Sequence, residues 1–449
     1  MQKKYFGTDG VRGLANQHPM TPEMAMALGQ AASVYFRHEK GTRRILIGKD
    51  TRRSSYMFEQ AIAAGVTSMG GEAVFLGPMP TPGVAFLTKA MRADAGIMIS
   101  ASHNPYQDNG IKFFDGLGHK LTDEAELEIE AFLDDKLKSL ERPIGDKIGR
   151  AYRVDDATGR YVESLKSVFP REDNLDGLKI VVDCAHGAAY KIAPSVFWEL
   201  GADVISLGVK PNGKNINGDC GALHPQTLCE TVLAEKANIG IALDGDADRV
   251  VLCDEHGQIV DGDHLIAMCA LELQLHDPIR GAKIVGTILS NMGVENYLAA
   301  RGIGMIRTAV GDRYILEALK ENSLILGGEP SGHVIFLDHA TTGDGVLAGL
   351  KVLAMMVRSG RPLSSLVGDI PLYPQVTKNI RVKERVALES IPAITQTIQA
   401  IEARLKGKGR VVVRYSGTEP LLRVMLEGED ASAIQKEQDV LEKVILANL

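Results

Sequence analysis

A serine stands in the loop that follows an apolar run in residues 96–105, GIMISASHNP. The run 97–99 predicts a buried strand, and the polar residues behind it favour a turn. A hydroxyl carried at the carboxyl end of a strand lies where open α/β sheets build their binding sites. Ser102 is therefore a candidate for a reacting group, with an ordinary loop serine as the alternative.

Three aspartates with one residue between each pair follow a second apolar run, in the sequence DGDADR. In an extended backbone, side chains at i, i+2 and i+4 point the same way, so we expect Asp244, Asp246 and Asp248 to face one point. Such a cluster favours a hard cation such as Mg²⁺, and the adjacent Arg249 is suited to a phosphate oxygen on the same metal. A calcium-binding EF-hand loop is excluded because Arg249 stands where that loop has glycine. A solvated acidic turn is the alternative.

A third loop, GGEPSGH at residues 327–333, combines groups that can bind a sugar. The carboxylate of Glu329, the hydroxyl of Ser331 and the imidazole of His333 can all hydrogen-bond sugar hydroxyls. The glycines around them let the backbone approach a ligand closely. An ordinary turn is the alternative.

A fourth loop, RYSGTEP at residues 414–420, follows another apolar run. Its guanidinium, its two hydroxyls and its glycine amide suit a phosphate group. These groups belong to Arg414, Ser416, Gly417 and Thr418, and Arg423 follows shortly after. The chain has no Walker motif, so the loop does not imply a nucleoside triphosphate. A serine/threonine turn is the alternative.

Two basic residues lie in glycine-containing segments nearer the N-terminus. Arg12 lies in GTDGVRG, and Lys112 lies in NGIK, ten residues after Ser102. Lys112 is suited to carry a proton, or to balance the charge of a phosphoryl group beside Ser102. A solvated lysine is the alternative.

The composition describes a globular protein. A chain of 449 residues with 45% hydrophobic and 24% charged residues predicts three or four domains. Its net charge of −7 gives no general reason to bind nucleic acid or an anionic membrane. The sequence shows no secretory signal and no apolar run long enough for a membrane span. The five cysteines form no CxxC pair, so we expect free thiols and a cytoplasmic protein.

An α/β framework is expected to hold these loops. Strand-like runs at 44–50, 179–184 and 283–289 are each followed by a helical pattern, which predicts three related α/β units. Those helices are expected at 54–69, 188–200 and 293–301. The tail differs, with strands expected at 375–382, 410–415 and 422–426, a helix at 388–406 and a final helix after it. We expect domains over residues 1–150, 151–254, 255–368 and 369–449.

One reaction gives a role to all four loops. A serine hydrolase would leave the aspartates and the phosphate loop without a role, and the chain has no G-x-S-x-G elbow. We also expect the neighbouring side chains of Ser102 and His103 to diverge. A phosphorylated serine, in contrast, needs a cation opposite it, a positioned alcohol as acceptor and a second site for a phosphate that does not react.

Six motifs, in the order GTDGVRG, ISASHNP, NGIK, DGDADR, GEPSGH and RYSGTEP, resemble those of the α-D-phosphohexomutase superfamily over the whole chain. The resemblance implies three related α/β domains with mixed sheets and a C-terminal α+β phosphate-binding domain around a central cleft. It implies an isomerase, an intramolecular phosphotransferase that works through a phosphoserine and a 1,6-bisphosphate intermediate. A Mg²⁺-dependent sugar-phosphate-binding protein without turnover is the alternative from another class.

The resemblance also implies roles for individual residues. Ser102 would carry the phosphoryl group and, with Asp244, Asp246 and Asp248, would bind one Mg²⁺ per subunit. His103, Lys112 and Arg249 would lie at the transfer site, with His103 and Lys112 as the acid or base candidates. The phosphosugar substrate would be held by Arg12, Glu329, Ser331, His333, Arg414, Ser416, Gly417, Thr418 and Arg423.

Within the superfamily, the chain is most similar to the bacterial branch that interconverts glucosamine 6-phosphate and glucosamine 1-phosphate. Asp312 stands where phosphomannomutase/phosphoglucomutase members look to have histidine, and GTDGVRG and GEPSGH also look more like the glucosamine branch. This branch implies glucosamine 1,6-bisphosphate as intermediate or activator and a supply of precursors for UDP-N-acetylglucosamine and the cell wall. It leaves a homodimer open. A phosphomannomutase/phosphoglucomutase is the alternative within the superfamily.

Overall fold

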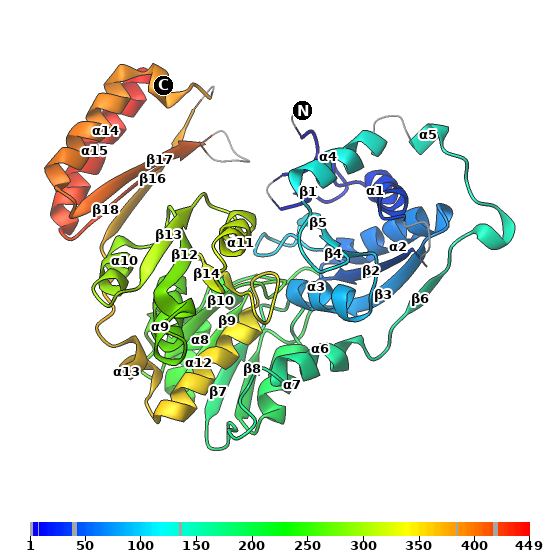
Figure 1. Cartoon of the computed structure of the whole chain (residues 1–449), viewed down its shortest axis with the longest axis horizontal. Coiled ribbons are helices and arrows are strands. Elements are labelled where there is room, and N and C mark those ends of the chain that lie inside the picture. The colour runs from blue at the N-terminus through cyan, green and yellow to red at the C-terminus, as the bar shows by residue number, and fades with distance from the viewer. Residues whose placement is uncertain (1–2, 8, 38–42, 134–136, 383–384, 416–420) are drawn as a thin grey trace.

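The computed structural model describes residues 3–7, 9–37, 43–133, 137–382, 385–415 and 421–449. Four units follow one another along the chain, each with its own sheet. Figure 1 shows the first unit in blue and cyan and the fourth in orange and red, on opposite sides of the second and third units. The three α/β units and the smaller C-terminal unit confirm the expected fold class.

The first unit has a mixed six-stranded sheet in the order β1-β5-β4-β2-β3-β6. Its strands are β1 (Val11–Leu14), β2 (Arg44–Lys49), β3 (Glu72–Pro78), β4 (Ala95–Ile99), β5 (Asp108–Asp115) and β6 (Ala151–Arg153). Its helices are α1 (Pro22–Tyr35), α2 (Arg53–Ser68), α3 (Thr81–Ala90), α4 (Asp123–Ala131) and the short α5 (Leu137–Ser139). Strand β5 runs antiparallel to β4, which brings its residues beside the loop that leaves β4. Through β6 this sheet extends past the boundary expected at residue 150.

The second unit has a five-stranded sheet in the order β11-β10-β9-β7-β8. Its strands are β7 (Lys179–Asp183), β8 (Asp203–Leu207), β9 (Ile239–Leu243), β10 (Val250–Asp254) and β11 (Ile259–Val260), and its helices are α6 (Ala157–Lys166), α7 (Ile192–Glu199) and α8 (Gln226–Glu235). Helix α7 begins four residues later than expected at 188. Ala185 and His186 have positive φ angles, and the backbone at Gly187 lies against Gly245, so this segment forms turns before the helix starts.

The third unit has a four-stranded sheet in the order β13-β12-β14-β15. Its strands are β12 (Lys283–Thr287), β13 (Gly304–Thr308), β14 (Leu326–Gly328) and β15 (Val334–Phe336), and its helices are α9 (Gly262–His276), α10 (Met292–Ala299), α11 (Asp312–Glu321), α12 (Gly345–Ser359) and α13 (Leu363–Val367).

The fourth unit has a three-stranded antiparallel sheet in the order β16-β18-β17. Its elements are β16 (Gln375–Arg381), α14 (Pro392–Leu405), β17 (Gly409–Tyr415), β18 (Leu421–Gly428) and α15 (Ala431–Asn448). Helix α14 begins later than the expected residue 388, because Leu388–Ser390 form a separate 3₁₀ turn and Pro392 starts the helix. Proline suits this first position because its missing N–H has no partner there in any case.

The hydrophobic core divides differently from the sheets. One buried cluster runs without a break through the first three units and includes Leu46, Val182 and Ile284. The fourth unit has a separate cluster, in which Leu422 of β18 and Leu441 of α15 take part. The first three units are therefore bound together by apolar packing. Among the described residues, no helix is long and apolar enough to cross a membrane.

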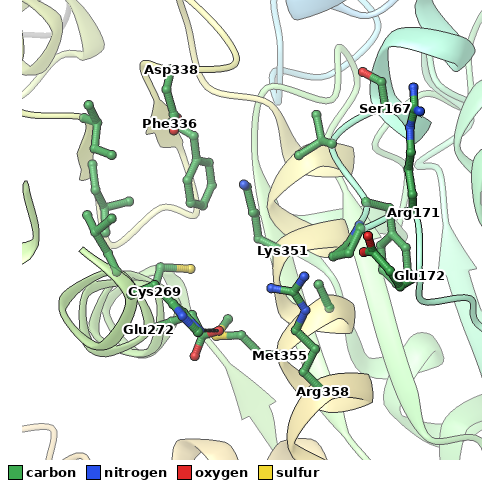
Figure 2. Close-up of a pocket in the computed structure, with 18 residues that line it drawn as sticks. Ser167, Arg171, Glu172, Cys269, Glu272, Phe336, Asp338, Lys351, Met355 and Arg358 are labelled. Atoms are coloured by element: carbon green, nitrogen blue, oxygen red, sulfur yellow. Dashed lines mark hydrogen bonds and ion pairs between the residues drawn. The ribbon is translucent and has the colours of Figure 1, made fainter.

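A cavity of about 490 Å³ lies between the second and third units. Figure 2 shows the side chains of Cys269, Phe336 and Lys351 around it. Charged groups at its rim have partners in the protein: Lys351 Nζ lies 2.8 Å from His339 Nε2, and Arg358 Nε lies 3.0 Å from Asp173 Oδ2. None of the predicted site residues that the structure describes lines this cavity.

Polar contacts join the fourth unit to the third. Glu427, fully buried on β18, accepts hydrogen bonds from the Met292 N–H at the start of α10 (3.1 Å) and from the side chain of Arg410. One residue earlier, the Asn291 N–H donates to Asp263 Oδ2 (3.1 Å) in the first turn of α9. Burial, followed by the charge of Asp261, raises the pKa of Asp263 to about 7.

We predict that Asp263→Asn removes a pH dependence of stability. A carboxyl group whose pKa is higher in the folded state than its unfolded value of about 4 stabilises the fold below pH 4, and this contribution is lost as the pH rises through 7. The amide keeps an acceptor for the Asn291 N–H but does not titrate. Between pH 4 and pH 8, the thermal midpoint of the wild type should fall relative to that of the variant, by ~3 °C.

The control is Asp277→Asn, which removes a half-buried carboxylate, paired with Arg280, beyond the other end of α9. Thermal scans at intervals of one pH unit would make the measurement. Parallel curves for the wild type and Asp263→Asn would contradict the prediction.

Candidate active site

The Ser102 hydroxyl is buried and points at the predicted acidic cluster. The loop leaves β4 at Ile99, and Ser102 has a left-handed backbone with φ of 50° and only 1% exposure. Its Oγ donates a hydrogen bond to Asp244 Oδ2 at 2.6 Å. The same Oγ lies 3.3 Å from His103 Nδ1, so the expectation that these two side chains diverge is wrong. The positive φ folds the loop back and leaves the hydroxyl and the imidazole on the same side.

The three aspartates do converge, although not in the expected way. Residues 244–249, which we call the acid turn, form a turn and not an extended strand, with Ala247 at φ of 55°. Carboxylate oxygens of Asp244, Asp246 and Asp248 nevertheless lie within 4.8 Å of one another, and all three residues are buried. The three carboxylates therefore converge because the backbone turns tightly, and not because side chains alternate along a strand.

Electrostatics distinguish the members of the acid turn. Burial, together with the charges of Asp248 and Asp246, raises the pKa of Asp244 well above its ordinary value. Burial also raises the pKa of Asp248, but the neighbouring Lys112 and His333 lower it by more, so the pKa of Asp248 lies below its ordinary value. Among the described residues, Asp246 Oδ1 and Asp248 Oδ1 are buried without a hydrogen-bond partner. Unpaired buried carboxylate oxygens at one point fit a hard divalent cation.

Lys112 is a buried ion-pair partner, and the interpretation as a solvated lysine is wrong. It lies on β5, directly opposite Met98 of β4, and is 1% exposed. Its Nζ lies 2.9 Å from Asp246 Oδ2 and 3.1 Å from Asp9 Oδ2. Burial lowers its pKa, but the nearby carboxylates of Asp246 and Asp9 reverse the effect and raise it. The ammonium group therefore keeps its proton, which favours charge balance over proton transfer.

His103 is in the opposite electrostatic situation. Burial, and then the positive charges of Arg249 and Arg12, lowers the pKa of His103 to about 4. At neutral pH its imidazole is uncharged, and a neutral imidazole can accept a proton. Of the two acid or base candidates, these opposite pKa shifts favour His103 as the acceptor.

Two arginines flank the acid turn. The Arg249 backbone N–H donates to Asp244 Oδ1 (3.2 Å), and its Nε lies 3.8 Å from Asp248 Oδ1. Arg12 forms an ion pair with Asp9. In the described part of the chain, the Nε atoms of both arginines are buried without a hydrogen-bond partner. The unpaired Nε donors of the two arginines lie beside the unpaired carboxylate oxygens of the acid turn. Together they fit a site that binds an anion and a cation side by side.

The predicted sugar loop lies between β14 and β15. Glu329 Oε2 accepts a hydrogen bond from the Ser331 hydroxyl (3.0 Å), and Oε1 accepts one from the Gly311 N–H (3.0 Å). His333 is buried against the acid turn, where its Nδ1 lies 3.7 Å from Asp248 Oδ2 and its Nε2 accepts from the Gly343 N–H. The structure thus brings Glu329 and Ser331 together. It places His333 away from them, in contact with Asp248 of the acid turn.

The predicted phosphate loop is only partly visible. Ser416, Gly417 and Thr418 lie outside the described residues, whereas Arg414 ends β17 and Arg423 lies on β18. The two arginines are direct cross-strand partners. Burial, and then the charge of Arg423, lowers the pKa of Arg414. Like charges directly opposite each other are unfavourable in a sheet, so this pair fits a site for an anion.

Sequence reasoning missed several residues of the site. The Thr81 hydroxyl donates to Asp246 Oδ2 (2.6 Å), and Asn217 donates to backbone oxygens of the Ser102 loop. Lys120 forms ion pairs with Asp9 and with Asp312, and so links the first unit to the third. The motif GTDG contains Asp9, a polar signal that could have been followed. Thr81 is the first residue of α3 and Asn217 lies in a turn, and the sequence around neither residue marks a site.

Comparison with known proteins agrees with this arrangement. Four domain families match the chain in order: phosphoglucomutase/phosphomannomutase alpha/beta/alpha domains I, II and III and the C-terminal domain. They match residues 3–139, 159–257, 261–373 and 378–444. The chain therefore belongs to the phosphoglucomutase/phosphomannomutase family and is an enzyme of the isomerase class.

Individual proteins resemble the chain over almost its whole length. The phosphoglucosamine mutase of Syntrophotalea carbinolica is 54% identical over 449 residues, which cover 99% of this chain and 98% of the relative. A phosphoglucomutase/phosphomannomutase family protein from Burkholderia thailandensis has a similar structure, with a TM-score of 0.82, 23% identity and coverage of 99% and 97%. The N-acetylphosphoglucosamine mutase of Aspergillus fumigatus, solved with GlcNAc-6P and magnesium, has a TM-score of 0.71 at 17% identity, with coverage of 99% and 96%.

Proposed function

We propose that this enzyme is a phosphoglucosamine mutase, which interconverts glucosamine 6-phosphate and glucosamine 1-phosphate through a phosphoserine and a 1,6-bisphosphate. The observation that carries the reaction class is the buried Ser102 hydroxyl, hydrogen-bonded to one of three converging aspartates. The choice of sugar is supported by 54% identity with a relative of that name over nearly the whole chain. The five free cysteines support a reducing cytoplasm as the place of action.

The acid turn would hold one Mg²⁺ through Asp244, Asp246 and Asp248, together with an oxygen of the seryl phosphate. The buried, unpaired oxygens of Asp246 and Asp248 fit this ion. Bound there, Mg²⁺ would neutralise charge on the phosphoryl group during transfer. Lys112 stays protonated beside the same carboxylates and adds a second positive charge.

The flanking groups complete the transfer site. Arg12 and Arg249 have buried Nε donors to offer to phosphoryl oxygens. His103 is neutral and lies beside Ser102 Oγ. It could take the proton of the attacking sugar hydroxyl as the bond between phosphorus and Ser102 Oγ breaks, and pass that proton to the departing Oγ. Donors already positioned around the phosphoryl group stabilise a transition state without reorganising.

The sugar would lie between the third and fourth units. Glu329 and Ser331 would bind its hydroxyls, and His333 would act through Asp248, which it contacts. Arg414 and Arg423, with Ser416, Gly417 and Thr418, would hold the phosphate that does not react. Because Ser102 serves one position of the sugar at a time, the bisphosphate has to turn around between two transfers. A fourth unit with its own core is suited to move as one body and release it.

We predict that the purified enzyme turns over glucosamine phosphates in preference to other hexose phosphates. The test measures kcat/KM for the 6-phosphates of glucosamine, glucose and mannose under identical conditions. We expect the glucosamine value to exceed the others by at least ~100-fold, because buried polar groups that hydrogen-bond a particular substituent reject analogues that lack it. A preference for glucose or mannose would favour the phosphomannomutase/phosphoglucomutase alternative. Binding without turnover of any of them would identify a binding protein and refute the proposal.

A further prediction concerns the covalent state of Ser102. Intact-mass spectrometry and peptide mapping of active enzyme should show one added phosphoryl group at Ser102. Ser102→Ala should lose nearly all mutase activity and keep its fold, since the change removes one buried hydrogen bond, to Asp244, and no apolar packing. An active preparation with the phosphoryl group on a different residue would contradict the mechanism.

The acid turn gives a third prediction for this function. Asp246→Asn should weaken Mg²⁺ binding and lower kcat by at least ~100-fold, because a neutral ligand offsets less of the ion's charge. Calorimetric titration with Mg²⁺ and steady-state kinetics would measure both effects. Asp254→Asn, a buried aspartate at the far end of β10, serves as the matched control. Full wild-type activity in excess EDTA would be incompatible with the metal's role.

A further inference from the structure

Two side chains hold the backbone of the serine loop, which we define as residues 100–105. Arg52 Nη2 donates hydrogen bonds to the carbonyl oxygens of Ser102 (3.1 Å) and Asn104. Asn217 Nδ2 donates to the same two oxygens, at 2.8 Å and 3.0 Å. Arg52 belongs to the first unit and Asn217 to the second, so the loop is gripped from two units at once.

We propose that Arg52 and Asn217 are positioning residues that hold the Ser102 hydroxyl over the acid turn. The inference rests on the proposed function, because Ser102 is its reacting group. A left-handed backbone is unfavourable for serine, so bonds from outside the loop have to maintain it. The two donors supply four such bonds, to the carbonyl of Ser102 itself and to that of the residue two positions later.

Arg52 is itself held rigidly. It is 0% exposed, and Asp50 accepts hydrogen bonds from its backbone N–H (2.9 Å) and from its Nη1. The Ser55 hydroxyl donates to Asp50 Oδ1 (2.7 Å), the oxygen that also accepts from the Arg52 backbone N–H. A planar guanidinium can bond a carboxylate with one nitrogen and two carbonyls with another, which a lysine ammonium cannot reproduce in this geometry.

Asn217 couples the serine loop to the acid turn. A Cβ atom at Gly245, inside the acid turn, would lie 2.6 Å from Ser102 O and 2.9 Å from Asn217 Nδ2. The acid turn therefore meets the serine loop backbone to backbone, with the Asn217 amide beside them. Asn217 has φ of 57°, and its own N–H donates to Ala185 O (3.0 Å), which fixes it to the second unit.

Further contacts join the first and second units beside the serine loop. The Thr51 hydroxyl donates to His186 O (2.5 Å), and the Arg53 N–H donates to Gly213 O (3.0 Å). Residues 51–53 of the first unit therefore lie along loops of the second unit that also carry Asn217. The contacts between the first and second units therefore set the distance from Ser102 Oγ to the carboxylates of the acid turn.

The donor chemistry of Asn217 makes the proposal testable. Asn217→Asp keeps the shape of the side chain but places a carboxylate against two carbonyl oxygens, which have no proton to give it. We expect kcat to fall ~30-fold to ~100-fold, since a displacement of about 1 Å at a reacting group costs that much. KM should stay within about twofold, because neither positioning residue is placed against the substrate.

Two control variants accompany the test. Asn215→Asp introduces the same charge two residues away, where the Asn215 side chain bonds Lys210 O and the Asn212 N–H. Arg52→Lys tests the other donor, with the adjacent, exposed Arg53→Lys as its control. Should Asn217→Asp not fold, Asn217→Gly removes the donor and tolerates the positive φ. Thermal midpoints would be measured for all variants.

A second readout does not depend on turnover. Hydrogen–deuterium exchange of the peptide spanning residues 100–110 should be at least ~10-fold faster in Asn217→Asp and Arg52→Lys, and unchanged in the two controls. Wild-type kcat with wild-type exchange in both variants would overturn the proposal, as would a raised KM at unchanged kcat. If the wild type itself turns over no hexose or hexosamine phosphate, the proposed function fails, while the exchange data still decide whether these residues hold the loop.

Discussion

The burial of three carboxylates at one point is the constraint on which the rest of the site depends. Asp244, Asp246 and Asp248 cannot all be charged in a buried turn unless positive charge lies close by. The protein supplies part of that charge with Lys112, which reaches Asp246 and Asp248 from the first unit. The acid turn belongs to the second unit, so its charge balance already requires two units in place.

The same requirement extends outward through a chain of ion pairs. Asp9 lies beside Lys112, Lys120 lies beside Asp9, and Asp312 of the third unit lies beside Lys120. Each of these buried or half-buried charges is paired with one from another segment, and a charge removed from water without a partner would be costly. The ionic network and the continuous apolar core therefore impose the same relative placement on the first three units. No described residue of the fourth unit belongs to that core.

Much of this arrangement could be predicted from the sequence. Continuous apolar runs located β2, β7 and β12 to within one or two residues, because strands covered by helices on both faces are apolar throughout. The acid turn was recognisable because carboxylates at that spacing have few other uses. Its backbone was not, because the left-handed conformation of Ala247 leaves no mark in the residue type. The late start of α7 has the same origin, since Ala185 and His186 give no sign of a turn.

Contacts between units were the least predictable part. Nothing in the sequence around Asn217 indicates that its amide reaches carbonyls more than one hundred positions earlier in the chain. For His103 a contact was wrongly excluded. Adjacent side chains in a loop usually diverge, but the positive φ angle of Ser102 brings its hydroxyl close to the His103 imidazole. Pairings of this kind depend on how finished units dock, and local patterns carry no information about docking.

The separate core of the fourth unit has a consequence for how such a protein changes over generations. Among the described residues, the apolar cluster around Leu422 and Leu441 stays inside that unit, so substitutions there disturb the unit's own packing. Substitutions around Leu46 or Val182 are felt across three units that share one cluster. A core substitution in the C-terminal unit therefore has to suit the packing of that unit alone, whereas one in the shared cluster has to suit the packing of three units.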